Sequence, residues 1–112
     1  MLIGNSGVTS FENLHRGKLI PMTTFTAQDV VSFYVNVYWD NPTQELGIHS
    51  VAFKWYADTK LISNPHRAIN FKVTPTTLSY QIPASVLGVG HCKVEALIDD
   101  NVVASKEFDI TP

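Results

Sequence analysis

The sequence contains few charged residues, one cysteine and no long apolar run, and each shortage excludes a class of protein. Charged residues make up 16% of the chain, against roughly 25% in an average soluble domain. The formal net charge is −2 and Lys and Arg are not gathered into a run, so we expect no nucleic-acid partner. Because Cys92 is the only cysteine, no internal disulfide can form.

No apolar stretch approaches the roughly 20 residues that a helix needs to cross a bilayer. We therefore expect no transmembrane segment. Residues 1–5 lack the basic segment and long apolar run of a secretory signal. This leaves the compartment open, because such a signal is removed from the mature chain.

The length of 112 residues fits one domain, and the hydrophobic fraction of 45% is sufficient for a core. The abundance of Thr, Ser, Val and Tyr relative to Glu, Lys and Arg favours sheets over surface helices. We expect a single domain over residues 1–112, in which residues 1–17 are irregular or in part mobile.

Apolar and polar side chains alternate with a period of two through residues 30–39 and 50–57. Neighbouring side chains of a strand point to opposite faces, so each segment would have one wholly apolar face. Shorter alternating segments follow, and seven or eight strands separated by turn residues predict a two-sheet antiparallel β-sandwich. The shorter segments are residues 61–62, 69–73, 78–82, 92–98 and 102–110. The predicted core consists of Phe33, Val35, Val37, Trp39, Val51, Phe53, Trp55, Phe71, Cys92, Val94 and Phe108.

The connections are predicted from turn-forming residues. Residues 99–101 suit a three-residue hairpin loop that places Ile98 and Val102 on the same inward face. Residues 83–87 predict one helical turn that Gly88 ends. Residues 18–22 are expected to be an edge strand, with residues 7–11 as a further short strand before it.

Two parts of the sequence resemble known sandwich families. VAFKWY at residues 51–56 resembles the third strand of immunoglobulin-like and fibronectin type III-like sandwiches, where a Trp packs across both sheets. Residues 88–110 are similar to the closing hairpin of many bacterial extracytoplasmic sandwich domains. Cys92 stands where an antibody domain has its second disulfide cysteine, but the opposing strand offers Val35 and Val37. The resemblance covers residues 26–112 and implies an immunoglobulin-like fold, not a particular activity.

No residue pattern predicts a catalytic centre, a metal site or a cofactor. The histidines at 15, 49, 66 and 91 form no His-x-His or His-x3-His pair, and His91 should face away from Cys92. Cys92 is expected to be an inert core thiol rather than a reactive one. Asp99 and Asp100 are expected to form a solvated hairpin tip, because calcium needs six to eight oxygen ligands.

Two short motifs also lack the partners that their chemistry needs. GNSG at residues 4–7 would place Ser6 in a loop, but no base to activate this hydroxyl is visible. GVG at residues 88–90 lacks the third glycine and following helix of a phosphate-binding turn.

The most informative predicted surface is aromatic. Exposed tyrosines with polar neighbours are common in protein interfaces and sugar-binding platforms. Two alternatives remain: tyrosine simply favours strands, or the N-terminal segment covers this face. The candidate binding residues, all on the non-core parity of their strands, are Tyr34, Asn36, Tyr38, Lys54 and Tyr56.

These observations favour a bacterial binding or structural module over an enzyme. We expect it to bind a protein partner, or to space parts of an assembly, in the periplasm, at the cell surface or in the medium. One alternative is a carbohydrate-binding module that uses Tyr34, Tyr38 and Tyr56. A second alternative is a small hydrolase, which would need a polar cleft. The oligomeric state and the identity of the partner stay open.

The assignment of inward and outward faces predicts unequal mutational effects. Trp55→Ala should lower the free energy of unfolding by about 3–5 kcal/mol, as truncation of a core aromatic does. Tyr34→Ala should have a small effect unless another segment covers that face. Chemical denaturation of both variants measures this, and small, equal losses would show that the faces are wrongly assigned.

Overall fold

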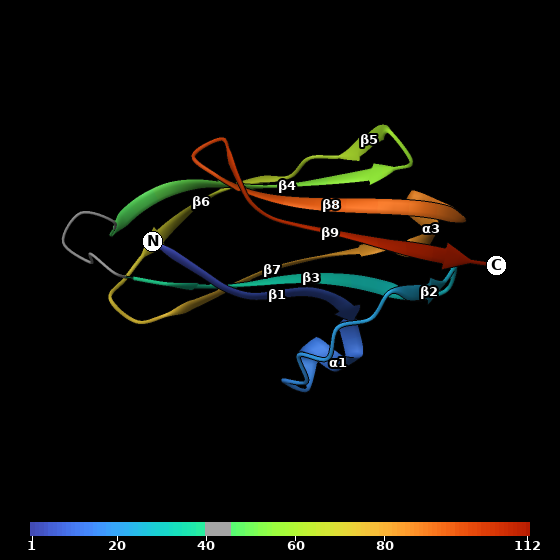
Figure 1. The fold of residues 1–112 in the computed structure, drawn as a ribbon, viewed down its shortest axis with the longest axis horizontal. Coiled ribbons are helices and arrows are strands. Elements are labelled where there is room, and N and C mark those ends of the chain that lie inside the picture. Colours follow the sequence, from blue (N-terminus) through green and yellow to red (C-terminus); the bar gives the residue numbers. More distant parts are fainter. Residues whose placement is uncertain (40–45) are drawn as a thin grey trace.

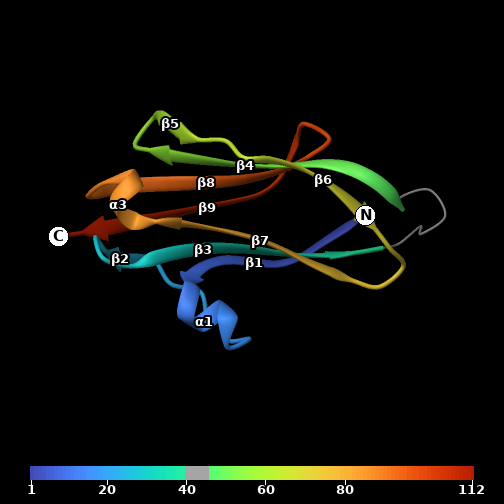
Figure 2. The same cartoon turned by 180° about the vertical axis from the view of Figure 1, so that it is seen from behind.

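The computed structural model describes residues 1–39 and 46–112, and its regular structure is almost entirely strand. Two sheets lie one above the other, and α1 projects from the outer side of one of them (Figures 1 and 2). No helix in these two ranges is long and apolar enough to cross a membrane. The strands are β1 (Leu2–Ser10), β2 (Thr24–Thr26), β3 (Val30–Tyr38), β4 (Gly47–Ala57), β5 (Lys60–Ser63), β6 (His66–Phe71), β7 (Thr76–Pro83), β8 (Gly90–Ile98) and β9 (Asn101–Thr111), and the helices are α1 (Phe11–His15) and α3 (Ala84–Leu87).

The smaller sheet has the order β1-β3-β7, and the larger has the order β2-β9-β8-β4-β5, with β6 also paired to β4. The all-β prediction is confirmed. The prediction of a purely antiparallel arrangement is wrong at one place, because β2 runs parallel to β9. β2 is only three residues long and buries Phe25 alone, so it has no alternating pattern that would reveal it.

A single apolar cluster draws residues from both sheets. Phe33 of β3 meets Phe53 of β4 edge-on, with ring centroids 6.2 Å apart, and Trp55 meets Phe108 edge-on at 6.3 Å. Burial of each such side chain contributes about 1.5–3 kcal/mol. The predicted core residues lie in this cluster except Trp39, which follows the end of β3 and is only partly buried against it.

The hairpin between β8 and β9 differs from the prediction. Its turn has two residues, Asp99 and Asp100, both with positive φ (49° and 67°), and Ile98 pairs with Asn101. Two left-handed residues match the twist of a tight hairpin. The register then shifts by one residue between Ala96 and Leu97, which restores the inward parity of the rest of β9. Val102, predicted to face inward, is therefore 54% exposed.

The N-terminal segment is more regular than predicted. Residues 1–17 contain β1, which pairs with β3, and α1. Ser10 caps the first turn of α1, because its Oγ accepts a hydrogen bond from the Asn13 N–H at 3.1 Å. The sequence conceals β1 because its register shifts between Ile3 and Ser6, which breaks the period of two. Residues 18–22, predicted as an edge strand, form no strand.

Two glycines of β1 lie against tyrosine rings of β3, and they make a matched pair of test positions. A Cβ added at Gly7 would lie 2.8 Å from Oη of the buried Tyr34, whereas one added at Gly4 would meet the ring of Tyr38, which is 42% exposed. Gly7→Ala should therefore lower the free energy of unfolding by about 1–3 kcal/mol through overpacking. Gly4→Ala should cost clearly less, because Tyr38 can turn into solvent. Denaturant titration of both variants decides this, and equal costs would contradict the packing described.

Candidate functional site

The five residues predicted to form one tyrosine-rich surface belong to two sheets. Tyr34, Asn36 and Tyr38 lie in β3 of the smaller sheet, and Lys54 and Tyr56 lie in β4 of the larger one. Their side chains have the non-core parity, so the two groups point to opposite outer sides of the molecule. The alternation of apolar and polar residues shows which side chains share a face of one strand, but it does not show which sheet that strand belongs to. No single tyrosine platform is formed.

Within the group on β3, the predicted exposure of Tyr34 is wrong. Tyr34 is 1% exposed, and its hydroxyl donates to the Leu19 carbonyl oxygen at 3.3 Å. Burial raises the pKa of Tyr34 by removing water from the charged form. The side-chain oxygen of Asn36 accepts a hydrogen bond from Thr77 Oγ1 at 2.7 Å, and only Tyr38 remains substantially exposed. The segment after α1 thus covers this face, which is one of the alternatives left open above.

The outer face of β4 and β8 carries a small polar network. The Tyr56 hydroxyl donates to Glu95 Oε1 at 2.9 Å, and this hydrogen bond is the main cause of a raised Tyr56 pKa. Lys93 Nζ lies 4.9 Å from the centre of the Tyr56 ring and 3.8 Å from Glu95 Oε2. The polar groups of Tyr56, Lys93 and Glu95 therefore contact one another. Few of their hydrogen-bonding groups remain for a ligand.

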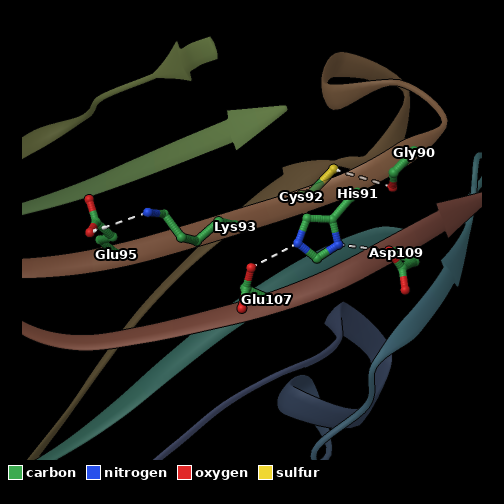
Figure 3. Close-up of polar contacts among 7 residues, drawn as sticks. All are labelled: Gly90, His91, Cys92, Lys93, Glu95, Glu107 and Asp109. Atoms are coloured by element: carbon green, nitrogen blue, oxygen red, sulfur yellow. Dashed lines mark hydrogen bonds and ion pairs between the residues drawn. The ribbon is translucent and has the colours of Figure 1, made fainter. Parts of the chain in front are cut away.

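His91 lies between two carboxylates of β9 (Figure 3). Its Nε2 is 2.8 Å from Glu107 Oε1, and its Nδ1 is 2.9 Å from Asp109 Oδ1. The hydrogen bond to Glu107 and then the one to Asp109 raise the pKa of His91. Because both ring nitrogens are engaged, this histidine is a poor metal ligand, and no group of His, Cys, Asp or Glu in residues 1–39 and 46–112 is arranged to hold a metal.

Cys92 points to the other side of β8, into the core. It is 1% exposed, and burial is the main cause of a raised pKa of its thiol. A thiol with a raised pKa is rarely ionised, and only the thiolate is a strong nucleophile. The structure therefore gives Cys92 a packing role.

The remaining candidate motifs are part of the framework. Ser6 lies within β1, where it pairs with Val35, so GNSG is strand and not a nucleophile loop. Asp99 accepts a hydrogen bond from the Ser50 N–H at 3.1 Å and contacts His49. The contact with His49, followed by that with Ser50, lowers the pKa of Asp99. These bonds hold the hairpin tip against β4.

A cleft of about 220 Å³ opens between the two sheets, where β7 of the smaller sheet faces β6 of the larger one. The buried Val51 and Phe53 of β4 line it, together with a mixture of apolar side chains and hydroxyls. Arg67 is the one charged residue among those that line it. The wall residues are Arg67 and Ile69 from β6 and Thr76, Thr77, Leu78 and Ser79 from β7.

Arg67 forms the top of an aromatic stack in this region. It pairs with the buried Val51 across β4 and β6, so its side chain starts toward the inner side of the sheet. Its guanidinium carbon lies 5.1 Å from the centre of the Tyr80 ring, and that ring stacks on Phe53 at 5.6 Å. Arg67 was not predicted from the sequence. It could have been found, because Arg67 stands two residues before Ile69 and four before Phe71, and so shares their inward face.

Comparison with known proteins identifies the fold. No protein-family model and no curated protein matches the chain. Among solved structures, it is similar to the crystal structure of an immunoglobulin-like protein from Pseudomonas aeruginosa, with a TM-score of 0.60 and 13% identity, over 99% of this chain and 98% of that one. The fold is immunoglobulin-like. This confirms the resemblance first seen at residues 26–112.

The immunoglobulin-like fold also occurs in proteins of other activities. The chain is similar to part of the alkylpurine DNA glycosylase AlkC from Pseudomonas fluorescens, solved bound to DNA containing an abasic site analog. That match has a TM-score of 0.51 and 12% identity, and it covers 98% of this chain but 30% of the glycosylase. At such identities the likeness concerns the fold alone, because one fold serves many functions.

The contacts of His91 predict a pH-dependent contribution to stability. Its pKa is raised above 6.5 in the folded chain, so the stabilisation is fully present below that pH and is lost as the pH rises through the folded-state pKa. We expect the difference in Tm between the unmodified chain and His91→Gln to be larger near pH 6 than near pH 9.

Histidine titration by NMR measures the cause directly. Glu107→Gln should lower the pKa of His91 more than Asp109→Asn does, because the bond to Glu107 has the larger effect. A His91 pKa at or below 6.5 in the unmodified chain would contradict the geometry in Figure 3.

Proposed function

We propose that this chain is a non-enzymatic, immunoglobulin-like module that binds an extended segment of another protein along the free edge of β7. The observation that carries the proposal is the state of that edge. β7 is the outer strand of the smaller sheet, and residues 76–83 contain no charged side chain. Natural proteins protect exposed edges with charges, prolines, bulges or covering segments, because an unprotected edge recruits further strands.

The direction of the backbone groups on β7 follows from its pairing with β3. The Ala84 N–H donates to the Asp29 carbonyl at 2.9 Å, and Ala84 and Asp29 continue the register that pairs Pro83 with Val30. Hydrogen-bonded and non-bonded pairs alternate along an antiparallel ladder. The even-numbered residues of β7 therefore bond to β3, and Thr77, Ser79 and Gln81 direct their N–H and C=O groups to the free edge.

Pro83 fits this assignment. It has an odd number, so it stands at a position where no N–H is needed for the ladder with β3. Because Pro83 is the last residue of β7, residues 76–82 of the free edge contain no proline. Three donors and three acceptors, from Thr77, Ser79 and Gln81, thus face outward on one straight strand with no register shift.

The other edge strands of the described chain are shorter, interrupted or charged. β1 has a register shift, and its Val8 carbonyl accepts a hydrogen bond from the Met22 N–H at 2.7 Å. β2 has three residues and β5 has four, and β6 carries Arg67. β9 is unpaired on its outer side over residues 101–108, where it carries Lys106 and Glu107. β7 is therefore the best template for strand addition, a common mode of peptide recognition.

The polar clusters of the larger sheet support binding rather than catalysis. The contacts around His91 and Tyr56 pair groups within the chain, and they place no base beside Ser6 or Cys92. The proposal keeps a bacterial source and a site outside the cytoplasm. Its support is the resemblance of the closing hairpin to extracytoplasmic sandwich domains and the bacterial source of the two similar structures.

Selection from a displayed library of random decapeptides tests this function. We expect enriched peptides to bind the unmodified chain and to bind Ser79→Pro about tenfold more weakly, because the variant loses an edge donor and gains a ring that obstructs pairing. Ser79→Ala is the matched control, since it removes the hydroxyl but keeps the N–H. Absence of enriched peptides, or equal affinity of the unmodified chain and Ser79→Pro for them, would overturn the proposal. Thermal unfolding establishes that Ser79→Pro is folded.

A further inference from the structure

The charge of Arg67 is not balanced within the described chain. Its guanidinium lies over Tyr80, and it makes no ion pair or side-chain hydrogen bond with any residue in 1–39 or 46–112. An arginine stacked on a ring uses its flat face, so its N–H groups remain free in the plane of the guanidinium. Those donors match a carboxylate, which they can bind through two parallel hydrogen bonds.

Within the two described ranges, the cleft around Arg67 supplies no acid. The other residues that line the cleft are neutral, and β7 has no Asp or Glu. From the facing sheet, the Tyr80 ring lies beneath the Arg67 guanidinium at 5.1 Å. Arg67 is exposed at the rim of the cleft, so a ligand that brings a negative group there meets an accessible positive charge, and charge complementarity favours it.

The size of the cleft limits what enters it. Its volume of about 220 Å³ is below the roughly 300–1,000 Å³ of pockets that enclose small-molecule ligands. A cleft of this size accommodates a side chain, while the rest of the ligand lies outside. The free edge of β7 borders the cleft and offers backbone groups to hold that remainder.

The position of Arg67 along β7 shows which part of a peptide it meets. Tyr80 lies within β7, with Thr76 to Ser79 on one side and Gln81 to Pro83 on the other. A strand paired with β7 continues in both directions past Tyr80, so Arg67 meets an internal side chain rather than a chain end. Alternate side chains of that strand point into the gap between the sheets.

A second copy of this chain does not supply the required acid. Strands β1, β2, β5, β6 and β7 contain no Asp or Glu. β9 also has a free edge, because β2 pairs only with its residues 109–111, but its Glu107 and Asp109 already contact His91. A dimer formed edge to edge would therefore offer Arg67 no carboxylate that is free of another partner. The occupant is therefore a different protein.

On these grounds, and resting on the proposed function, we propose that β7 recognises an extended strand of another protein that carries an internal Asp or Glu, whose carboxylate enters the cleft and binds Arg67. The backbone of β7 provides affinity, and Arg67 provides specificity and alignment. The sites of contact are the edge groups of Thr77, Ser79 and Gln81, and the guanidinium over Tyr80.

Isothermal titration calorimetry with synthetic peptides tests this inference. The probes are blocked decapeptides of alternating Thr and Val in which one central Val is replaced by Glu, Gln or Lys. The Glu peptide should bind the unmodified chain about 10- to 100-fold more tightly than the Gln peptide, as expected for hydrogen bonds to a charged group. The Lys peptide should bind most weakly.

Variants of the protein assign the preference to one side chain. Arg67→Gln should abolish the preference for Glu and leave the affinity for the Gln peptide unchanged, and Arg67→Lys should retain part of it. Lys72→Gln is the matched control, because it removes an exposed positive charge just beyond β6. An equal loss in Lys72→Gln would mean a general attraction and would overturn the role of Arg67. Thermal unfolding of each variant accounts for any loss of fold.

The outcomes separate this inference from the function on which it rests. If Glu and Gln peptides bind equally and Ser79→Pro weakens both, edge recognition stands and the acidic preference is wrong. If no peptide binds, or if Ser79→Pro binds every peptide as tightly as the unmodified chain does, both proposals are wrong. Self-association that Ser79→Pro abolishes, seen by sedimentation, would make a second copy the occupant and would likewise overturn the inference.

Discussion

The dry layer between the two sheets is the constraint on which the molecule depends. Phe33 and Phe53 meet across it, and Trp55 and Phe108 extend it toward the closing hairpin. Every strand that contributes to this layer must keep its register to within one residue, because a slip would turn its apolar side chains into water. The bulge in the β8–β9 ladder shows how strict this is, since the chain accepts an exposed Val102 in order to keep Phe108 inside.

The sequence predicted the parity of the long strands because burial on one side leaves a direct trace in the order of side chains. It also predicted the helical turn before Gly88, which the structure shows as α3. Features that depend on pairing between distant strands left no such trace. The two carboxylates around His91 come from a neighbouring strand, and their proximity follows from a register that no local pattern contains.

The candidate binding surface was less predictable than the core for the same reason. Tyr34 has the parity of an outward residue, yet the segment containing Leu19 folds over it and accepts its hydroxyl. Tyr38 and Tyr56 share a pattern but not a sheet. Arg67 matters through Tyr80, a residue on the opposite sheet, and such cross-layer contacts require the full arrangement in space.

The two edges of the smaller sheet are unequal, and this inequality sets a limit on assembly. The β1 edge is engaged by the chain's own backbone at Met22, whereas the β7 edge is open. A sheet that can lengthen on one side only cannot stack its own copies into an endless ribbon through that sheet. On the proposed function, strand addition to this sheet therefore takes place at β7 alone.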